Sequence, residues 1–320
     1  RSRAENRTCL MKFWVGVTDN NWFNYLAARQ FDEVNFWQPS AKPLFKDGGE
    51  RFGMPFLFKL KKPYHHVAGG GFFVKNIKLP LASAWEFFGE RNGASSLDEL
   101  LELLAPHSGT RSLTQEIGCT ILANSFFLPP KKWLPDPPGW ANSIVRGKGY
   151  NSDEPDGAVI WTAVQSSFLT QQPSVDDSDF SKFAIRERFG EPVLVTPRLG
   201  QASFRALVTE AYDKRCAITG ENTLAVLEAA HIVPYGKQGT HEVRNGLLLR
   251  ADFHRLFDVG LVSVSPELRI KVSRIIHESW FNGKVYYRLN DQPLSVLPHR
   301  MADQPDRDFL DWHMRNCFQD

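Results

Sequence analysis

The feature that most constrains the fold lies near the middle of the chain, where residues 151–181 contain no Lys or Arg. The acidic residues of this stretch are Asp153, Glu154, Asp156, Asp176, Asp177 and Asp179. The chain has 320 residues, whereas a single hydrophobic core seldom grows beyond roughly 250–300 residues. We therefore expect two folded domains, at residues 11–170 and 191–320, joined by an acidic linker at residues 171–190.

Composition and cysteine spacing exclude several classes of protein. No apolar run reaches the ~18 residues of a membrane-spanning helix, and no apolar stretch follows the basic residues at the start. We therefore expect neither a membrane protein nor a signal peptide. The four cysteines lie far apart and form no Cys-x-x-Cys pair, which disfavours a thiolate zinc site and favours a reducing cytoplasm.

The first ~150 residues are rich in aromatic residues, Gly and Pro, and are typical of short strands joined by turns. Dense runs of β-forming residues occur at 13–17, 55–60, 71–74 and 117–123. Helical patterns occur at 20–29, 81–89 and 156–169, and Ser95 is expected to cap another helix that ends at Leu104. These patterns are typical of an α+β fold or of a β-barrel.

The C-terminal part carries residues of catalytic type at the ends of expected elements. After a helical pattern at 201–212, His231 ends a strand-like run and Asn245 follows a loop. A further expected helix at 251–257 carries His254, and Asp258 follows one turn later. An imidazole and a carboxylate four residues apart lie on one helix face, where they suit Mg²⁺, Mn²⁺ or Zn²⁺.

Phosphodiester hydrolysis needs a base that deprotonates water and a cation that neutralises charge on the phosphate. His231 is the natural base, because a histidine side chain ordinarily titrates near pH ~6.5. Taken singly, each residue is weak evidence, since a lone histidine is more often packed or solvated, and a His/Asp pair on a helix is more often a surface contact. The order and spacing of the residues together favour a nuclease.

Three segments carry a resemblance to a known family. They are Cys216-Ala-Ile-Thr-Gly, Glu228-Ala-Ala-His-Ile-Val-Pro-Tyr and the run from Asn245 to Asp258. Together they resemble the HNH (ββα-metal) endonucleases. The resemblance implies that the first histidine of this set is the general base and that Asn245 fixes the loop that orients it. It also implies a divalent metal, Mg²⁺ or Mn²⁺ with Zn²⁺ as the alternative, bound by His254 and Asp258.

One position departs from the family pattern. Many HNH enzymes carry a metal-binding Asp or His directly before the base, whereas this chain has Ala230. Glu228 lies two residues earlier on the same strand face and is the expected third ligand, with a water molecule or a plain surface carboxylate as the alternatives.

The charge distribution of the C-terminal part favours a polyanionic partner. Residues 197–290 contain 13 Lys or Arg against 9 Asp or Glu, a local net charge of +4. The arginines nearest the site are Arg244, Arg250 and Arg255. Each is expected to contact DNA phosphate, or else to form an ordinary salt bridge.

The N-terminal strands resemble a second family. Val34-Asn-Phe-Trp-Gln-Pro-Ser40, Pro55-Phe-Leu-Phe58 and the run from Val67 to Val74 are similar to strand motifs of the PUA superfamily, which includes EVE, ASCH and SRA modules. Such modules are small barrels, and several bind modified bases in an aromatic pocket. The resemblance therefore implies an α+β protein whose N-terminal strands form a β-barrel with flanking helices. The combination with an HNH nuclease resembles modification-dependent (type IV) restriction endonucleases. The resemblance implies double-stranded DNA carrying 5-methyl- or 5-hydroxymethylcytosine as the substrate.

A base taken out of a duplex needs aromatic faces for stacking and polar groups for its edge. Trp22, Phe36 and Trp37 are candidates for stacking, and the candidates for the edge are Asn35, Gln38 and Asp19. For each aromatic residue, packing in the core is the alternative. Two other functions stay open: an HNH nuclease directed by sequence or nucleic-acid structure, and a non-catalytic nucleic-acid-binding regulator. Double-strand cutting also favours a homodimer with two active sites.

Overall fold

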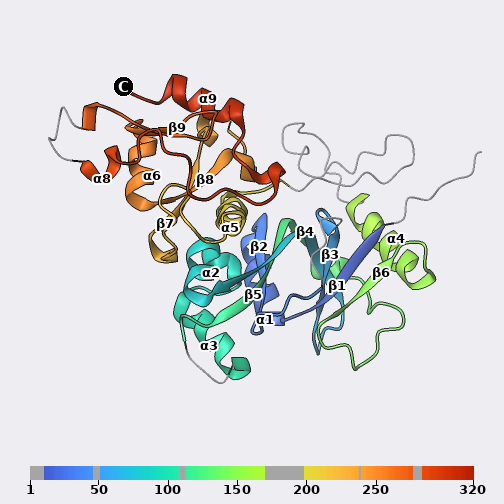
Figure 1. The fold of residues 1–320 in the computed structure, drawn as a ribbon. Coiled ribbons are helices and arrows are strands. Elements are labelled where there is room, and N and C mark those ends of the chain that lie inside the picture. Colours follow the sequence, from blue (N-terminus) through green and yellow to red (C-terminus); the bar gives the residue numbers. More distant parts are fainter. Residues whose placement is uncertain (1–10, 46–50, 109–111, 170–197, 238, 277–282) are drawn as a thin grey trace, which may run out of the picture. The chain divides into compact units, whose positions relative to one another are not determined.

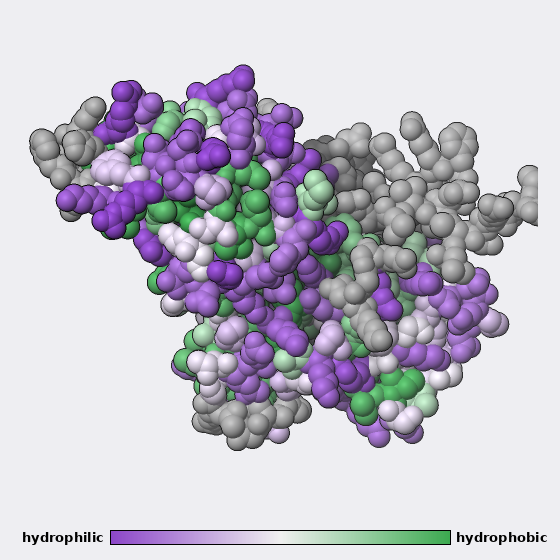
Figure 2. All heavy atoms as spheres, in the orientation of Figure 1, coloured by the Kyte–Doolittle hydropathy of each residue, from purple (hydrophilic) through white to green (hydrophobic). Residues whose placement is uncertain are grey.

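The structure, a computed structural model, describes residues 11–45, 51–108, 112–169, 198–237, 239–276 and 283–320 (Figure 1). The chain folds as two compact units, Arg1–Arg198 and Leu199–Asp320. The expected linker at residues 171–190 lies outside the described residues. Every helix within the ranges above is too short or too polar to span a bilayer. Hydrophilic side chains cover much of the visible face of each unit (Figure 2).

A six-stranded sheet forms the centre of the first unit, with the strand order β2-β5-β4-β3-β1-β6. Its strands are β1 (Lys12–Thr18), β2 (Glu33–Gln38), β3 (Pro55–Leu60), β4 (Val67–Pro80), β5 (Glu116–Phe127) and β6 (Gly147–Asn151). β1 and β3 are parallel, and every other neighbouring pair is antiparallel. The four runs of β-forming residues all lie within these strands.

The sheet is open, which corrects the expectation of a barrel. In the part of the chain that the structure describes, β2 pairs only with β5 and β6 pairs only with β1, so both are edge strands. Runs of β-forming residues identify individual strands, but closure depends on pairing between edges that are far apart in sequence. The mixed α+β class is confirmed, because helices alternate with the strands along the chain.

Four α-helices accompany the sheet: α1 (Asn20–Arg29), α2 (Leu81–Phe88), α3 (Leu97–Ser108) and α4 (Pro155–Leu169). α1 begins after Asp19, whose carboxylate accepts hydrogen bonds from the backbone N–H of Asn21 at 3.0 Å and of Trp22 at 3.4 Å. α3 is capped one residue later than expected. The hydroxyl of Ser96 accepts from the N–H of Glu99 at 3.1 Å, while Glu99 reaches back to the N–H of Ser95.

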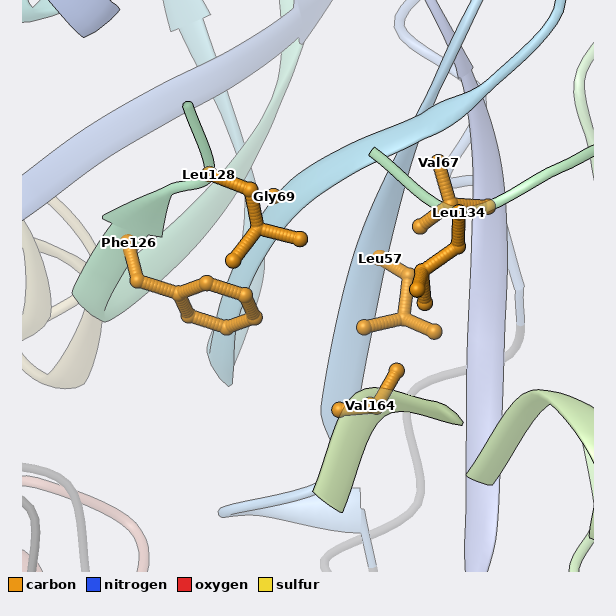
Figure 3. A pocket seen from close by; sticks show the side chains of 7 residues that line it. All are labelled: Leu57, Val67, Gly69, Phe126, Leu128, Leu134 and Val164. Atoms are coloured by element: carbon orange, nitrogen blue, oxygen red, sulfur yellow. The ribbon is translucent and has the colours of Figure 1, made fainter. Parts of the chain in front are cut away.

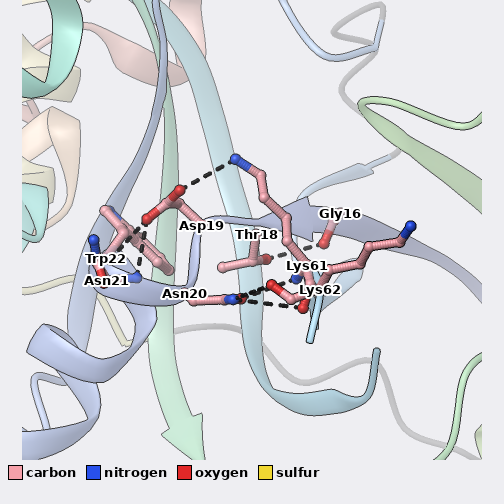
Figure 4. Close-up of polar contacts among 8 residues, drawn as sticks. All are labelled: Gly16, Thr18, Asp19, Asn20, Asn21, Trp22, Lys61 and Lys62. Carbon is pink, nitrogen blue, oxygen red and sulfur yellow. Dashed lines mark hydrogen bonds and ion pairs between the residues drawn. The ribbon is translucent and has the colours of Figure 1, made fainter. Parts of the chain in front are cut away.

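The start of α1 is tied to the turn that follows β3 (Figure 4). The Asn20 side chain donates to the carbonyl of Lys62 at 2.8 Å and accepts from the N–H of Lys61 at 3.0 Å. Lys61 Nζ also lies 3.2 Å from the carboxylate of Asp19. These polar contacts fix the entry of the helix while its apolar face packs on the sheet.

The second unit contains two two-stranded sheets, β7-β8 and β9-β10. Its strands and α-helices are α5 (Gln201–Ala211), β7 (Leu227–His231), β8 (Gly246–Arg250), α6 (Ala251–Asp258), β9 (Val262–Val264), β10 (Ile270–Val272), α8 (Lys284–Tyr287) and α9 (Arg307–Asn316). Short 3-10 turns of the chain are η2 (Gly89–Asn92), η3 (Pro130–Lys132), η5 (Leu224–Val226), η6 (Tyr235–Lys237), η7 (Val243–Asn245) and η8 (Met301–Asp303). The core of this unit is built from α5, β7, β8 and α6, with Phe204, Val208, Phe253 and Phe257 fully buried.

A buried histidine fastens α9 to this core. His313 stacks on the ring of Phe257 with centroids 3.7 Å apart. Its Nδ1 lies 2.8 Å from the hydroxyl of Ser263, and its Nε2 lies 3.2 Å from the carbonyl oxygen of Phe257. A neutral imidazole satisfies both contacts, because Nε2–H donates and Nδ1 accepts. The C-terminal helix is thereby tied to α6, which carries His254 and Asp258.

Candidate active site

His231 is the last residue of β7 and lies opposite Gly246, the first residue of β8. Its ring stacks on Phe204 of α5 with centroids 3.8 Å apart and planes inclined by 10°. Gly246 makes this arrangement possible, since a Cβ there would lie 2.5 Å from Val208 Cγ2 and 3.0 Å from Phe204 Cζ. The absence of a side chain at Gly246 thus allows α5 to approach the hairpin and support one face of the imidazole.

Asn245 holds the loop that follows His231. Its side chain is fully buried; Oδ1 accepts from the N–H of Val233 at 2.9 Å, and Nδ2 donates to the Val233 carbonyl at 3.0 Å. Nδ2 also donates to the carbonyl of Thr240 at 2.8 Å. One amide therefore ties together the two ends of the loop, a geometry that only Asn or a similar donor–acceptor side chain supplies.

His254 lies between two carboxylates. Its Nδ1 is 2.6 Å from Glu228 Oε2 of β7, and its Nε2 is 3.4 Å from Asp258 Oδ2, one turn later on α6. The structure thus brings together all three residues that the sequence singles out as metal ligands. It places them as one imidazole with a carboxylate at each ring nitrogen.

The surroundings of His231 keep its ring neutral. Burial, together with the charges of His241 and His254, lowers the pKa of His231 to about 4. At pH 7 the ring therefore carries an unprotonated nitrogen that can accept a proton. Because the charge of His254 contributes to this lowered pKa, His254 on α6 and His231 at the end of β7 lie close enough to interact electrostatically.

The donor chemistry around His254 fits a divalent cation held by two protein ligands. Two ligands that each lie ~2.0–2.2 Å from a cation are about 3–3.5 Å apart, and Nε2 of His254 and Oδ2 of Asp258 are separated by 3.4 Å. Glu228 occupies the other ring nitrogen, as a carboxylate that orients a ligating imidazole commonly does. No group of three or more His, Cys, Asp or Glu side chains within the described ranges is arranged to hold a metal ion. Water and phosphate would complete such a site.

Ala230 is fully buried in the core of the second unit, opposite Leu247 of β8. A carboxylate or imidazole at this position would have to be buried among apolar side chains, which costs free energy without a partner. The departure from the family pattern at this residue therefore has a packing explanation in this chain.

Residues 216–265 match the HNH_2 family, described as HNH endonuclease. This segment is an HNH endonuclease domain. The match begins at Cys216 and contains His231, Asn245, His254 and Asp258. No curated protein matches the chain. Among solved structures, the chain is similar to one titled "Modification dependent TagI restriction endonuclease", with 14% identity and a TM-score of 0.26 over 89% of this chain and 75% of the other. A TM-score this low does not establish a common fold.

The three arginines near the HNH domain's site differ in their availability to DNA. Arg244 lies 3.0 Å from the carboxylate of Asp306. Arg250 makes two hydrogen bonds to Asp252, at 2.6 and 2.7 Å. Arg255 is exposed on α6 and has no acidic partner within the described parts of the chain. The salt-bridge alternative thus accounts for the first two, and Arg255 is the best placed to contact phosphate.

Three of the residues expected to bind a modified base lie in the core of the first unit. Trp22 is 5% exposed and lies edge-on to Phe36 at 5.4 Å and to Phe58 at 5.3 Å. Phe36 is itself buried, and Asn35 is fully buried with its amide donating to Asn92 Oδ1 at 2.9 Å. The faces of these side chains are packed against protein in this structure, which supports the core-packing alternative.

Trp37 and Gln38 are partly exposed at the end of β2. The indole N–H of Trp37 donates to the carbonyl of Asn92 at 2.8 Å, and Gln38 Oε1 accepts from Arg146. A hollow elsewhere in this unit is lined by Leu57, Val67, Gly69, Phe126, Leu128, Leu134 and Val164 (Figure 3). It is apolar and has no room for a water molecule, so it cannot accept a base.

The structure also places side chains at the site that the sequence did not single out for it. Phe204 lies under His231, although its spacing in α5 predicts only a core position. His241 lies beside His231, with 3.1 Å between Nδ1 of His241 and Nε2 of His231. His241 belongs to a loop without periodicity, so its residue type was the only signal available.

Proposed function

We propose that this chain is a metal-dependent endonuclease that hydrolyses phosphodiester bonds of DNA and that a modified base in the DNA directs its cleavage. The nuclease part of this proposal rests on one observation. In an HNH endonuclease domain, the imidazole of His231 at the end of β7 is neutral, and the charge of His254 contributes to lowering its pKa. His254 in turn places its Nε2 3.4 Å from the carboxylate of Asp258.

The protein groups divide the reaction between them. His231 accepts a proton from water, and the resulting hydroxide attacks phosphorus while the P–O bond to the leaving oxygen breaks. Asn245 keeps the loop after His231 in place, and Phe204 supports the face of its ring. His254 and Asp258 would hold a divalent cation, Mg²⁺ or Mn²⁺ with Zn²⁺ as the alternative, which would supply positive charge to the phosphate.

Cleavage of a DNA duplex under a titration of Mg²⁺ and of Mn²⁺ tests the nuclease proposal. Wild type is expected to cut only with metal, and His231→Ala to lose at least about 10²-fold in rate, the usual contribution of a general base. His299→Ala is a matched control, because His299 is exposed and pairs with Asp213 rather than with the site. Absence of metal-dependent cutting by the wild type would favour the non-catalytic regulator instead.

The dependence on modification rests on the resemblance of the N-terminal strands to PUA-superfamily modules. We propose that residues 11–170 are the reader of 5-methyl- or 5-hydroxymethylcytosine, that residues 171–190 are a linker and that residues 191–320 are the nuclease with a C-terminal extension. Because Trp22, Asn35 and Phe36 are buried, the partly exposed Trp37 and Gln38 are the members of the predicted pocket that stay in the proposal.

Otherwise identical duplexes that carry cytosine, 5-methylcytosine or 5-hydroxymethylcytosine test the reader. We expect faster cleavage of a modified duplex. Equal rates on all three would remove the reader and favour an HNH nuclease that is directed by sequence or by nucleic-acid structure. Sedimentation of the protein on a modified duplex tests the proposed homodimer, in which each copy contributes one active site.

A further inference from the structure

The loop between η6 and η7 places a second imidazole against His231. His241 Nδ1 lies 3.1 Å from His231 Nε2, which is hydrogen-bonding distance. His241 is partly exposed, and its ring packs parallel to that of Tyr235, with centroids 4.5 Å apart and planes inclined by 10°. The two histidines therefore form a pair in which one imidazole reaches solvent and the other faces the site.

We propose that His241 is a positioning residue that holds His231 in the tautomer able to deprotonate water, and that it then takes up the proton from His231. This inference rests on the proposed function of the HNH site and deepens it. It assigns to His241 a role that acts through His231 and not through direct contact with the DNA.

The argument begins with the hydrogen that lies between the two rings. A neutral imidazole has one N–H and one unprotonated nitrogen, so the contact needs one ring to donate and the other to accept. If Nε2–H of His231 donates to Nδ1 of His241, then Nδ1 of His231 is unprotonated and free for water. With the opposite donor, Nδ1 of His231 carries the hydrogen and cannot act as the base.

The position of His241 is determined by neighbours on both sides. Tyr235 stacks on its ring, and the carbonyl of the preceding residue, Thr240, accepts a hydrogen bond from the buried Asn245 amide at 2.8 Å. Asn245 therefore acts on the base by two routes. It fixes the backbone at Val233, two residues after His231, and it fixes the backbone at Thr240, directly before His241.

Proton uptake by His241 also compensates for a weakness of the base. Burial, together with the charges of His241 and His254, lowers the pKa of His231 to about 4. The other two neighbours of the ring, Phe204 of α5 and Gly246 of β8, carry no charge. Such a base is available over a wide pH range but holds a proton weakly. A neighbour that accepts the proton favours its removal from water.

The steps balance without a further reactant. An O–H bond of water breaks as the N–H bond at Nδ1 of His231 forms, and the hydroxide attacks phosphorus while the leaving oxygen departs with a proton from solvent. The Nε2–H bond of His231 then breaks as an Nδ1–H bond forms on His241. His231 is then neutral with its hydrogen on Nδ1. After the leaving oxygen has departed, this Nδ1–H proton passes to solvent while the proton on Nδ1 of His241 returns to Nε2 of His231, so that both rings regain their starting tautomers.

Nitrogen-15 NMR of the histidine-labelled full chain without DNA tests the tautomer directly. The signal of His231 is identified by its loss in His231→Gln. We expect hydrogen on Nε2 and an unprotonated Nδ1 in the wild type at pH 7, and a mixture of both tautomers in His241→Phe. A wild-type His231 with its hydrogen on Nδ1 would overturn the proposal, whether or not the protein cuts DNA.

Cleavage kinetics provide the second readout. In His241→Phe the aromatic stack is kept and the hydrogen bond is lost, so we expect kcat to fall by about 10²-fold with KM changed by less than about threefold. In His241→Gln the side-chain oxygen can accept from Nε2–H but cannot take the proton, so about tenfold of that loss should return. Equal kcat values for the two variants, or a wild-type kcat in His241→Phe, would contradict a positioning role.

The matched control is His299→Phe, which removes an exposed histidine far from the pair in sequence and should leave both readouts unchanged. The wild type could show the expected tautomer, and His241→Phe could lose it, while neither the wild type nor any variant cuts DNA. That result would support the role of His241 in fixing the tautomer of His231 and would refute the proposed nuclease function. The two proposals are therefore separable.

Discussion

The substitution Gly246→Ala tests whether the close approach of α5 to the hairpin supports the site. Gly246 has φ −128° and ψ 144°, a β conformation that alanine adopts without strain. The added methyl group would lie 2.5 Å from Val208 Cγ2 and 3.0 Å from Phe204 Cζ. The perturbation is therefore purely steric, and it pushes on the ring that stacks under His231.

The expected cost follows from this overlap. Both neighbours are fully buried, so neither can turn into solvent, and overpacking of this kind costs about 1–3 kcal/mol. Local opening of the hairpin should then become about 5–150-fold more favourable, since each 1.4 kcal/mol is about tenfold. We also expect kcat for DNA cleavage to fall, because a shift of Phe204 moves the imidazole that it supports.

Amide hydrogen exchange of the full chain, read by mass spectrometry on peptides from β7 and β8, measures this opening in one unit at a time. Peptides from β3 and β4 of the first unit provide the internal reference. Gly236→Ala is the matched control: a Cβ at Gly236 meets no atom within 4 Å. It should leave exchange in the hairpin unchanged.

A compensating substitution makes the reasoning refutable. Val208→Ala removes the methyl group nearest to the added one, so the double variant Gly246→Ala/Val208→Ala should be more stable than the sum of the two single effects predicts, by about 0.5–3 kcal/mol. Strict additivity would show that the cost of alanine at Gly246 does not come from this contact. Unchanged exchange in the single variant Gly246→Ala would refute the steric argument altogether.

Three other predictions follow from the same unit. Glu228→Gln should weaken metal-dependent cleavage by about 10–100-fold, measured as a higher metal concentration for half-maximal rate, because Glu228 orients the imidazole of His254. Arg255→Ala should weaken DNA binding and reduce the slope of log affinity against log salt concentration by about one. Arg250→Ala should instead mainly speed amide exchange around α6, because it breaks the two hydrogen bonds to Asp252. Burial lowers the pKa of His313 to about 4, so the folded unit disfavours protonation of this side chain. The contribution of neutral His313 to stability should be complete above pH ~6.5 and should be lost as the pH falls toward 4. Amide exchange in α9 as a function of pH measures this loss.

The site was more predictable from the sequence than its surroundings because its chemistry is placed by local rules. An i, i+4 spacing puts His254 and Asp258 on one face of α6, where Nε2 of His254 and Oδ2 of Asp258 lie 3.4 Å apart. The strand that ends at His231 and the helix at 251–258 are likewise local in origin. Local rules do not state which nitrogen of His254 meets which carboxylate, so from the sequence alone Glu228 could be a metal ligand or a surface carboxylate.

The N-terminal unit shows the opposite case. Its four α-helices lie within a few residues of the predicted ranges, and four of its six strands contain a predicted run of β-forming residues, since these patterns are local. The sequence patterns did not predict β6 (Gly147–Asn151), and they indicated only part of β4 (Val67–Pro80). Whether an aromatic ring fills a core or lines a pocket depends on what packs on both of its faces, and the sequence does not contain that information for one residue alone. Trp22 lies against Phe58, which is 36 residues away in the chain, and the sheet stays open although its strand pattern is also that of a barrel.

The pairing of His231 with His241 depends both on local sequence patterns and on contacts between residues that are apart in the chain. Spacing can identify His231 because it ends a strand-like run, whereas its partner His241 lies in a loop that is held by the buried amide of Asn245. Asn245 therefore contacts the backbone near both histidines, whereas its motif indicates only a role in the loop after His231. By holding the backbone after His231 and before His241, it determines which imidazole nitrogens meet, and with them the tautomer of the base. Substitution of Asn245 should consequently alter the proton distribution on His231 as well as the loop itself.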